Sequence, residues 1–182
     1  MRIPIFELER VQSLYENTVE HNLTESGFHP LRLDEVLSPA QLAELAATAI
    51  GYGQTNGSLP LREQIAALYP GQSAANVLVT NGSAEANYVA CHTLLDPGDE
   101  VVMMVPNYMQ IWGVVEELGA HPKAFHLREE DAWAPDLAEL RSLVGPRTKM
   151  IAVCNPSNPT GAVLSREAMA EIVAVAERVG AW

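Results

Sequence analysis

The feature that most constrains the fold of this chain is a regular alternation between short apolar runs and longer segments of helical periodicity. The runs 76–80, 100–105, 121–127 and 148–154 are nearly all apolar, and each is followed by a segment whose apolar side chains recur every three or four positions. Strands of this kind, separated by helices, are typical of a parallel sheet that is covered on both faces. The sequence therefore predicts an α/β fold with a doubly wound, mostly parallel sheet.

The N-terminal part of the chain has a different character. Segments 6–18 and 38–50 show helical spacing without an intervening apolar strand, and the glycine-rich connection 51–61 leads into a further helix. We therefore expect residues 1–50 to form an N-terminal helical arm with part of a small domain, and residues 51–182 to form an incomplete large domain.

The charge balance and the cysteines exclude several classes of protein. With 11 basic and 23 acidic residues the formal charge is -12, which repels nucleic acid and anionic membranes. No apolar run approaches the ~20 residues of a membrane span, and the N-terminus lacks the apolar core of a signal peptide. We expect a cytoplasmic protein without nucleic-acid or membrane partners, in which Cys91 and Cys154 are buried free thiols and no metal is bound.

Ligands of open parallel sheets bind outside the carboxyl ends of the strands, so the residues that follow each strand are the first candidates for a site. After 76–80 the sequence is Asn81-Gly82-Ser83-Ala84 at the start of a helix. Unpaired backbone N–H groups and the positive end of the helix dipole at such a position can bind a phosphate. The alternative is that Ser83 only caps the helix.

Two further strand ends carry unusual residues. Tyr108 follows the strand at 100–105, where its ring can stack on a flat heterocycle or simply belong to the core. Asn158 lies between Pro156 and Pro159, which fix the backbone on either side of it. An amide held in this way suits a hydrogen bond to a polar ligand atom, and the alternative is a turn that is merely stiffened by proline.

Four motifs, taken together, give a resemblance to a known family. They are "YGQTNGSLPLREQIA", "VTNGSAEA", "LLDPGDEVVMMVPNY" and "NPSNPTGAVLS", in this order between residues 52 and 165. The set resembles that of class I/II aminotransferases, the fold-type I enzymes that use pyridoxal 5'-phosphate (PLP). The resemblance implies that residues 51–182 are part of the PLP-binding large domain and that the full-length protein is a homodimer acting on amino acids and 2-oxo acids.

The resemblance also assigns roles to individual residues. The backbone around Gly82, Ser83 and Ala84 would hold the cofactor phosphate, and Tyr108 would stack on the pyridine ring. Asn158 would donate a hydrogen bond to the ring hydroxyl. Tyr52 would reach the phosphate bound by the neighbouring subunit.

The same resemblance places the catalytic residues after Trp182. These are the aspartate that pairs with the ring nitrogen, the Schiff-base lysine, and the arginines for the phosphate and the substrate carboxylate. Lys123 and Lys149 begin strands, at the end opposite the ligand crevice, so neither is a credible substitute. We expect this chain by itself to contain no catalytic residue, to be inactive, and to bind PLP weakly or not at all.

A second likeness concerns the segment "LTESGFHPLRLDEVL", residues 23–37. It resembles the N-terminal segment of capreomycidine-synthase-like members of the family, whose substrates carry a guanidinium group. Glu25, Gly27 and His29 are therefore candidate substrate contacts.

Three alternatives to an aminotransferase fragment follow from the same residues. One is a PLP-dependent lyase or cyclase of the same fold, since these chemistries share the N-terminal motifs. Another is a non-catalytic module that binds PLP or phosphate, or that serves in assembly. A nicotinamide-binding Rossmann domain shares the architecture, but the turn "NGSAEA" lacks the Gly-x-Gly-x-x-Gly pattern.

Overall fold

The structure is a computed structural model that describes residues 4–24, 27 and 30–182. The chain forms two compact units, one made of residues 1–26 and 83–182 and the other of residues 27–82. The first unit contains the sheet, and the second is a succession of short helices. The domain boundary expected at residue 50 stays a prediction.

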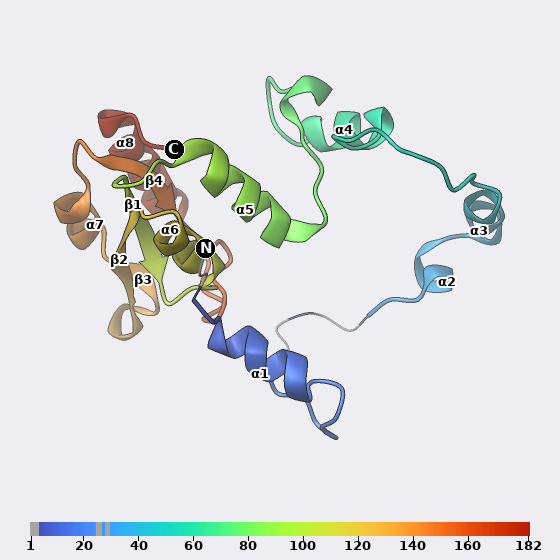
Figure 1. Cartoon of the computed structure of the whole chain (residues 1–182), viewed down its shortest axis with the longest axis horizontal. Coiled ribbons are helices and arrows are strands. Elements are labelled where there is room, and N and C mark those ends of the chain that lie inside the picture. The colour runs from blue at the N-terminus through green and yellow to red at the C-terminus, as the bar shows by residue number, and fades with distance from the viewer. Residues whose placement is uncertain (1–3, 25–26, 28–29) are drawn as a thin grey trace. The chain divides into compact units, whose positions relative to one another are not determined.

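The sheet of the first unit has four strands in the order β3-β2-β1-β4 (Figure 1). The central strand β1 (Glu100–Val105) runs parallel to both β2 (His121–Arg128) and β4 (Thr148–Ala152). These elements confirm the strands predicted at 100–105, 121–127 and 148–154. The short strand β3 (Ala134–Pro135), which the sequence did not predict, pairs antiparallel with β2 at the edge.

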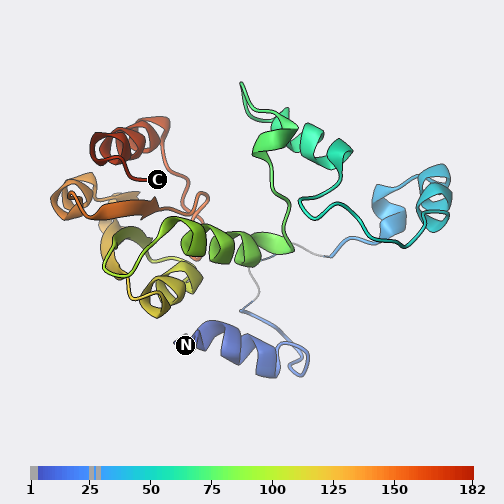
Figure 2. The ribbon, with the colours of Figure 1, turned by 45° about the horizontal axis from the view of Figure 1, so that its top comes forward.

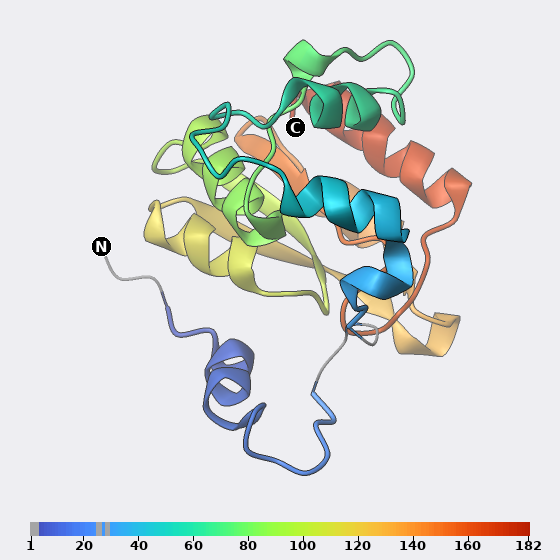
Figure 3. The same cartoon turned by 90° about the vertical axis from the view of Figure 1, so that its right-hand side faces the viewer.

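Helices cover both faces of this sheet, as predicted from the apolar strands. In Figure 2 the helices α5 and α6 lie on one face and α7 and α8 on the other, and Figure 3 shows α5 and α6 side by side. Their bounds are α5 (Gly82–Leu94), α6 (Gln110–Glu117), α7 (Leu137–Leu143) and α8 (Arg166–Val179). The doubly wound, mostly parallel α/β fold is therefore confirmed.

Strand β1 shows why both faces must be covered. Residues 101–104 have no exposed surface. Val101 and Met103 belong to the core beneath α5 and α6, and Val102 and Met104 to the core beneath α7 and α8. Because side chains alternate between the two faces of a strand, an entirely apolar run is stable only between two helical layers.

The amino end of the sheet is held by a buried carboxylate. The side chain of Glu100 is 5% exposed, and its two oxygens lie 2.6 Å from Lys123 Nζ and 2.6 Å from Arg147 Nη2. Lys149, the second residue of β4, is exposed. Both lysines therefore lie in the amino-terminal halves of their strands, as the sequence indicated.

The outer edge of β4 is extended by the last residue of the chain. Trp182 N–H donates to Lys149 O at 2.9 Å, and Ile151 N–H donates to Trp182 O at 2.8 Å. This pair of bonds to the residues that flank Met150 has the pattern of a parallel bridge. Helix α8 thus returns the chain to the sheet beside β4.

The second unit contains α2 (Leu33–Val36), α3 (Pro39–Ala46), α4 (Leu59–Ala66) and the 3₁₀ turn η1 (Ala74–Asn76). The strand predicted at 76–80 is wrong, since the described residues form no strand there.

The reason is the lack of a neighbouring strand. In the segment 77–80, Val79 N–H donates to Asn56 O at 3.1 Å, and the side chain of Leu78 is 56% exposed. An apolar run becomes a strand only when a second backbone segment satisfies its N–H and C=O groups.

The N-terminal arm belongs to the same unit as the sheet. It contains α1 (Glu7–Tyr15), which confirms a helix within the predicted segment 6–18. Of the helices in the described parts of the chain, none combines the length and the apolar character that a membrane span requires.

Candidate functional site

Two of the predicted site residues leave the sheet at the same edge. Strands β1 and β4 are parallel neighbours, with Met103 opposite Ala152 in the register. The segments that follow them, which carry Tyr108 and Asn158, therefore both begin at the carboxyl edge of the sheet. In an open parallel sheet this edge is where ligands bind.

The segment after β1 is a turn that is held by its own asparagine. Asn107 Nδ2 donates to Met104 O at 2.9 Å, and Asn107 Oδ1 accepts from Tyr108 N–H at 2.7 Å. The Val105–Pro106 peptide bond is cis. The two hydrogen bonds of Asn107 fix the backbone from which the Tyr108 side chain projects.

Tyr108 is half-buried, and its hydroxyl and ring both have partners in the N-terminal arm. The hydroxyl donates to Glu9 Oε1 at 2.7 Å. The Phe6 ring lies edge-on, with centroids 4.9 Å apart and planes at 66°. Burial, followed by the hydrogen bond to Glu9, raises the pKa of Tyr108 to about 12, so the phenol is neutral at physiological pH.

The segment after β4 uses its two Asn-Pro pairs differently. Asn155 Oδ1 accepts from Leu164 N–H at 2.9 Å and so closes the loop. Two backbone hydrogen bonds, both of 2.8 Å, hold the turn between Asn155 and Leu164. Ser157 N–H donates to Ala162 O, and Gly161 N–H donates to Ser157 O. Both Asn-Pro peptide bonds are cis.

By contrast, Asn158 is a half-buried residue whose side-chain amide has no hydrogen-bond partner within the described chain. The adjacent Ser157 Oγ is buried and also has no hydrogen-bond partner there. The buried Ser157 hydroxyl is expected to have a partner, since burying it unpaired costs free energy. Asn155 therefore has a structural role, and Asn158 has donor and acceptor capacity left for a ligand.

Helix α5 begins at Gly82, whose φ of +81° favours glycine. Its N–H donates to Thr80 O at 3.0 Å, and Thr80 Oγ1 donates to Gly82 O at 2.9 Å. Ser83 is the second residue of the helix rather than the residue before it, so the structure does not place it as the cap. Ser83 and Ala84 lie in the exposed first turn, where N–H groups of a helix have no intrahelical acceptor.

A bridge connects this helix start to the Tyr108 segment. Gln110 Nε2 donates to Ala84 O at 2.7 Å, and Gln110 Oε1 accepts from Asn87 Nδ2 at 3.1 Å. Because Gln110 follows Tyr108 by two residues, the first turn of α5 lies beside the turn after β1. Sequence reasoning missed Gln110, whose only signal was its nearness to Tyr108.

The structure does not test the roles of the remaining four predicted residues. Tyr52 lies in an exposed connection of the second unit, with an exposure of 109%. Gly27 also belongs to that unit. Glu25 and His29 lie outside the described residues. The roles predicted for these four residues stay predictions.

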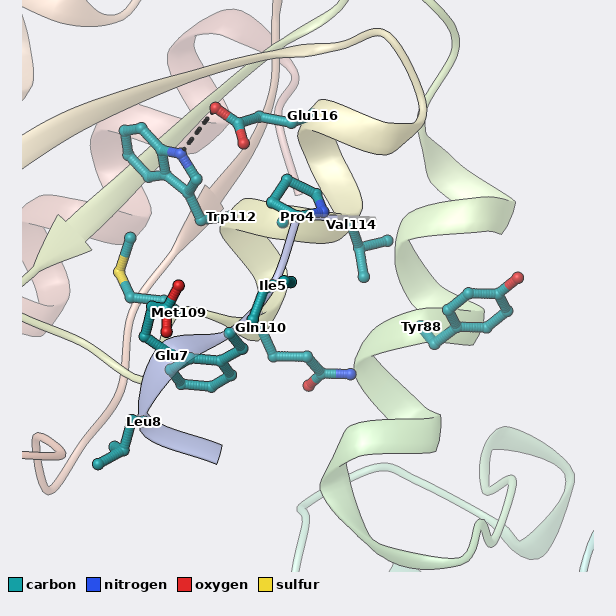
Figure 4. Close-up of a pocket in the computed structure, with 12 residues that line it drawn as sticks. Pro4, Ile5, Glu7, Leu8, Tyr88, Met109, Gln110, Trp112, Val114 and Glu116 are labelled. Carbon is teal, nitrogen blue, oxygen red and sulfur yellow. Dashed lines mark hydrogen bonds between the residues drawn. The ribbon is translucent and has the colours of Figure 1, made fainter. Parts of the chain in front are cut away.

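A cavity of about 450 Å³ lies next to this cluster, between the arm and the helices α5 and α6 (Figure 4). Tyr88 borders it from α5, and Trp112, whose indole N–H donates to Glu116, borders it from α6. None of the predicted cofactor residues lines it. The largely apolar walls do not suit a phosphate, so this cavity is distinct from the predicted site.

The groups collected at the sheet edge match the chemistry of a phosphorylated pyridine. The start of α5 offers backbone donors to a dianion, Tyr108 offers an aromatic ring, and Asn158 offers an amide without a partner. The donor set therefore fits PLP.

Comparison with known proteins gives consistent results. A family model described as "Aminotransferase class I and II" matches residues 20–182. Capreomycidine synthase from Streptomyces vinaceus is 36% identical over 169 residues, which is 88% of this chain and 43% of that protein. The glutamate-pyruvate aminotransferase AlaA from Escherichia coli is 35% identical over 137 residues, or 72% of this chain and 34% of that protein.

A solved structure agrees with these relatives. The crystal structure of a PLP-dependent aminotransferase from Streptococcus suis matches 100% of this chain with a TM-score of 0.91 and 34% sequence identity. This chain covers 50% of that one. In each of these three matches, then, the chain spans half of the relative's length or less.

Proposed function

Because the chain belongs to the aminotransferase class I and II family, we propose that it is the N-terminal part of a PLP-dependent enzyme that transfers the amino group of an amino acid to a 2-oxo acid. The family uses PLP, which when bound delocalises the negative charge that develops at the amino-acid α-carbon. The residues of this chain would hold and orient the cofactor. In the full-length protein we propose a homodimer in which Tyr52 contacts the phosphate bound by the partner.

The observation that carries the proposal is the contrast between the two asparagines after β4. Asn155 is engaged with Leu164 N–H, whereas the amide of Asn158 has no partner within the described residues. We assign Asn158 to the ring hydroxyl of PLP and Tyr108 to the face of the ring. The backbone N–H groups near Gly82, Ser83 and Ala84 would bind the phosphate, where the helix dipole also favours an anion.

We further propose that this chain contains no lysine able to react with the cofactor aldehyde. Lys123 Nζ is bound to Glu100 at 2.6 Å in the amino-terminal half of β2. Lys149 lies in the corresponding half of β4 and is exposed, whereas imine formation needs a desolvated amine beside the aldehyde. The reactive lysine, and the aspartate for the ring nitrogen, would come from outside these 182 residues.

Binding of PLP to the full-length natural protein tests the assignment of Asn158. Equilibrium dialysis should give an affinity that falls about three- to tenfold in Asn158→Ala, the effect of one lost hydrogen bond. Asn17→Ala, at an exposed position after α1, is the matched control and should leave the affinity unchanged. Equal affinities of the two variants would contradict the assignment.

Borohydride reduction tests the claim about the lysines. After reduction in the presence of equimolar PLP, mass spectrometry of peptides should show no stoichiometric adduct at Lys123 or Lys149. A stoichiometric adduct at either residue would show that the chain carries its own reactive lysine.

A second candidate is a PLP-dependent lyase or cyclase of the same fold. The similarity to capreomycidine synthase favours it, since that match covers 88% of this chain. Exchange of the amino group between amino acids and 2-oxo acids, assayed with the full-length natural protein, separates the two candidates because only an aminotransferase forms a new amino acid from the 2-oxo acid.

A further inference from the structure

The N-terminal arm contacts one residue of the candidate site directly. Glu9 precedes Tyr108 by 99 residues in the sequence, yet its Oε1 accepts a hydrogen bond from the Tyr108 hydroxyl at an O···O distance of 2.7 Å. Phe6, at the residue before α1, lies edge-on to the same ring at a centroid distance of 4.9 Å. These positions are three apart, so both side chains lie on one side of the first turn of α1.

The combination of contacts leaves the Tyr108 side chain little freedom. Its backbone N–H is fixed by Asn107, its hydroxyl by Glu9, and an edge-on ring packs against it. A half-buried tyrosine without such contacts would exchange between rotamers and would pay an entropic cost on stacking with a ligand. A ring that is already held in place avoids this cost.

We propose that Phe6 and Glu9 are positioning residues that hold the Tyr108 ring in the orientation in which it stacks on a flat heterocycle. The proposal rests on the role assigned above to Tyr108. It gives the N-terminal arm a function in the site of its own chain, although neither residue need touch the cofactor.

The charge of Glu9 adds a second effect to this contact. Burial and the neighbouring carboxylate both disfavour the phenolate, because an anion at Tyr108 would be poorly hydrated and would repel Glu9. Among the described residues, Glu9 is the charged group that acts on this phenol. The contact with the arm therefore favours the protonated form of Tyr108, and ionisation of Tyr108 would weaken that contact.

Nitration by tetranitromethane reports on this contact without any cofactor, because the reagent attacks the exposed phenolate form of tyrosine. The 182-residue chain is treated at pH 8, and the rate at Tyr108 is measured by mass spectrometry of peptides relative to Tyr15, which is 56% exposed. We expect Glu9→Ala to raise the relative rate at Tyr108 roughly tenfold, the effect of one pKa unit on the phenolate population. Phe6→Ala should raise it as well, by exposing the ring.

Glu7→Ala is the matched control, since Glu7 lies in the same first turn of α1 and makes the same contribution to the helix dipole. It should leave the rate at Tyr108 unchanged, and far-UV circular dichroism should show the same helix content in all variants. An unchanged rate in both Glu9→Ala and Phe6→Ala, or an equal rise in Glu7→Ala, would overturn the proposal.

Adding PLP separates this proposal from the proposed function. If Tyr108 stacks on the cofactor ring, PLP should protect it from nitration in the full-length natural protein, and half-protection should need at least about fivefold more PLP in Glu9→Ala than in Glu7→Ala. Absence of protection in the full-length natural protein would count against the role of Tyr108, while the rates without PLP still decide whether the arm holds the ring. Equal protection in the two variants would overturn positioning by Glu9.

Discussion

Neutralising Glu100 should destabilise the chain at its sheet, and the structure allows the magnitude to be worked out. Glu100→Gln keeps the shape of the side chain and removes its charge. The carboxylate is 5% exposed and lies 2.6 Å from each of two cationic nitrogens, on Lys123 and Arg147. Lys123 comes from β2 and Arg147 from the turn before β4, so the carboxylate joins three neighbouring strands.

Breaking a buried ion pair by removing one partner costs about 3–5 kcal/mol when the other charge stays buried. Here the side chains of Lys123 and Arg147 are 34% and 74% exposed, so both cations regain water when the carboxylate is neutralised. The glutamine oxygen can still accept one hydrogen bond. We therefore expect the free energy of unfolding to fall by about 1–3 kcal/mol.

Urea unfolding at pH 7, followed by circular dichroism, measures this loss. Glu171→Gln is the matched control, because Glu171 pairs with Arg141 at 2.9 Å and both side chains are well exposed, at 39% and 45%. Exposed pairs contribute less than about 1 kcal/mol. Equal losses in the two variants would refute the reasoning that burial gives the Glu100 pair its strength.

The pH dependence provides a second criterion. The hydrogen bond from Lys123 holds the pKa of Glu100 below its ordinary value, with Arg147 acting in the same direction against the effect of burial. A carboxylate whose pKa is lower in the folded state contributes stability that is fully present above the unfolded pKa, about 4.3, and is lost as the pH falls through the folded pKa. The difference between wild type and Glu100→Gln should therefore be constant from pH 7 to about 5 and shrink below about 4. A difference that persists under acid conditions would also refute the reasoning.

Two further predictions concern the core and the thiols. Phe125→Ala should lower the free energy of unfolding by about 3–5 kcal/mol in the same urea assay, because the Phe125 side chain is 0% exposed between β2 and the α7/α8 layer. A loss below about 1 kcal/mol would show that this layer is loosely packed. In the folded chain a thiol reagent should label Cys154 at least about tenfold faster than Cys91, because Cys91 is 1% exposed and burial raises the pKa of its thiol. Peptide mass spectrometry measures the two rates. Equal labelling would show that α5 does not cover Cys91.

Local sequence determined most of the architecture of the first unit. Residues 100–105 are apolar at every position after Glu100, which specifies a strand buried on both faces, and the helix that follows residue 165 begins where Ser165 accepts from Ala168 N–H at 3.1 Å. The same local patterns located the strand ends, and with them Tyr108 and Asn158. Such features are readable because side-chain periodicity and capping depend on residues only a few positions apart.

Tertiary structure decided what depends on partners distant in the sequence. The run 77–80 has the composition of a strand and forms none among the described residues, because a ladder needs a second backbone segment. Of two asparagines in the same kind of Asn-Pro pair, only Asn155 accepts a hydrogen bond from Leu164 N–H within the described residues. Likewise, Glu9 reaches Tyr108 across 99 residues of sequence. Hydrogen bonds of this kind are fixed by the packing of whole elements, so the sequence names the candidate residues and the fold decides which of them keep a free polar group.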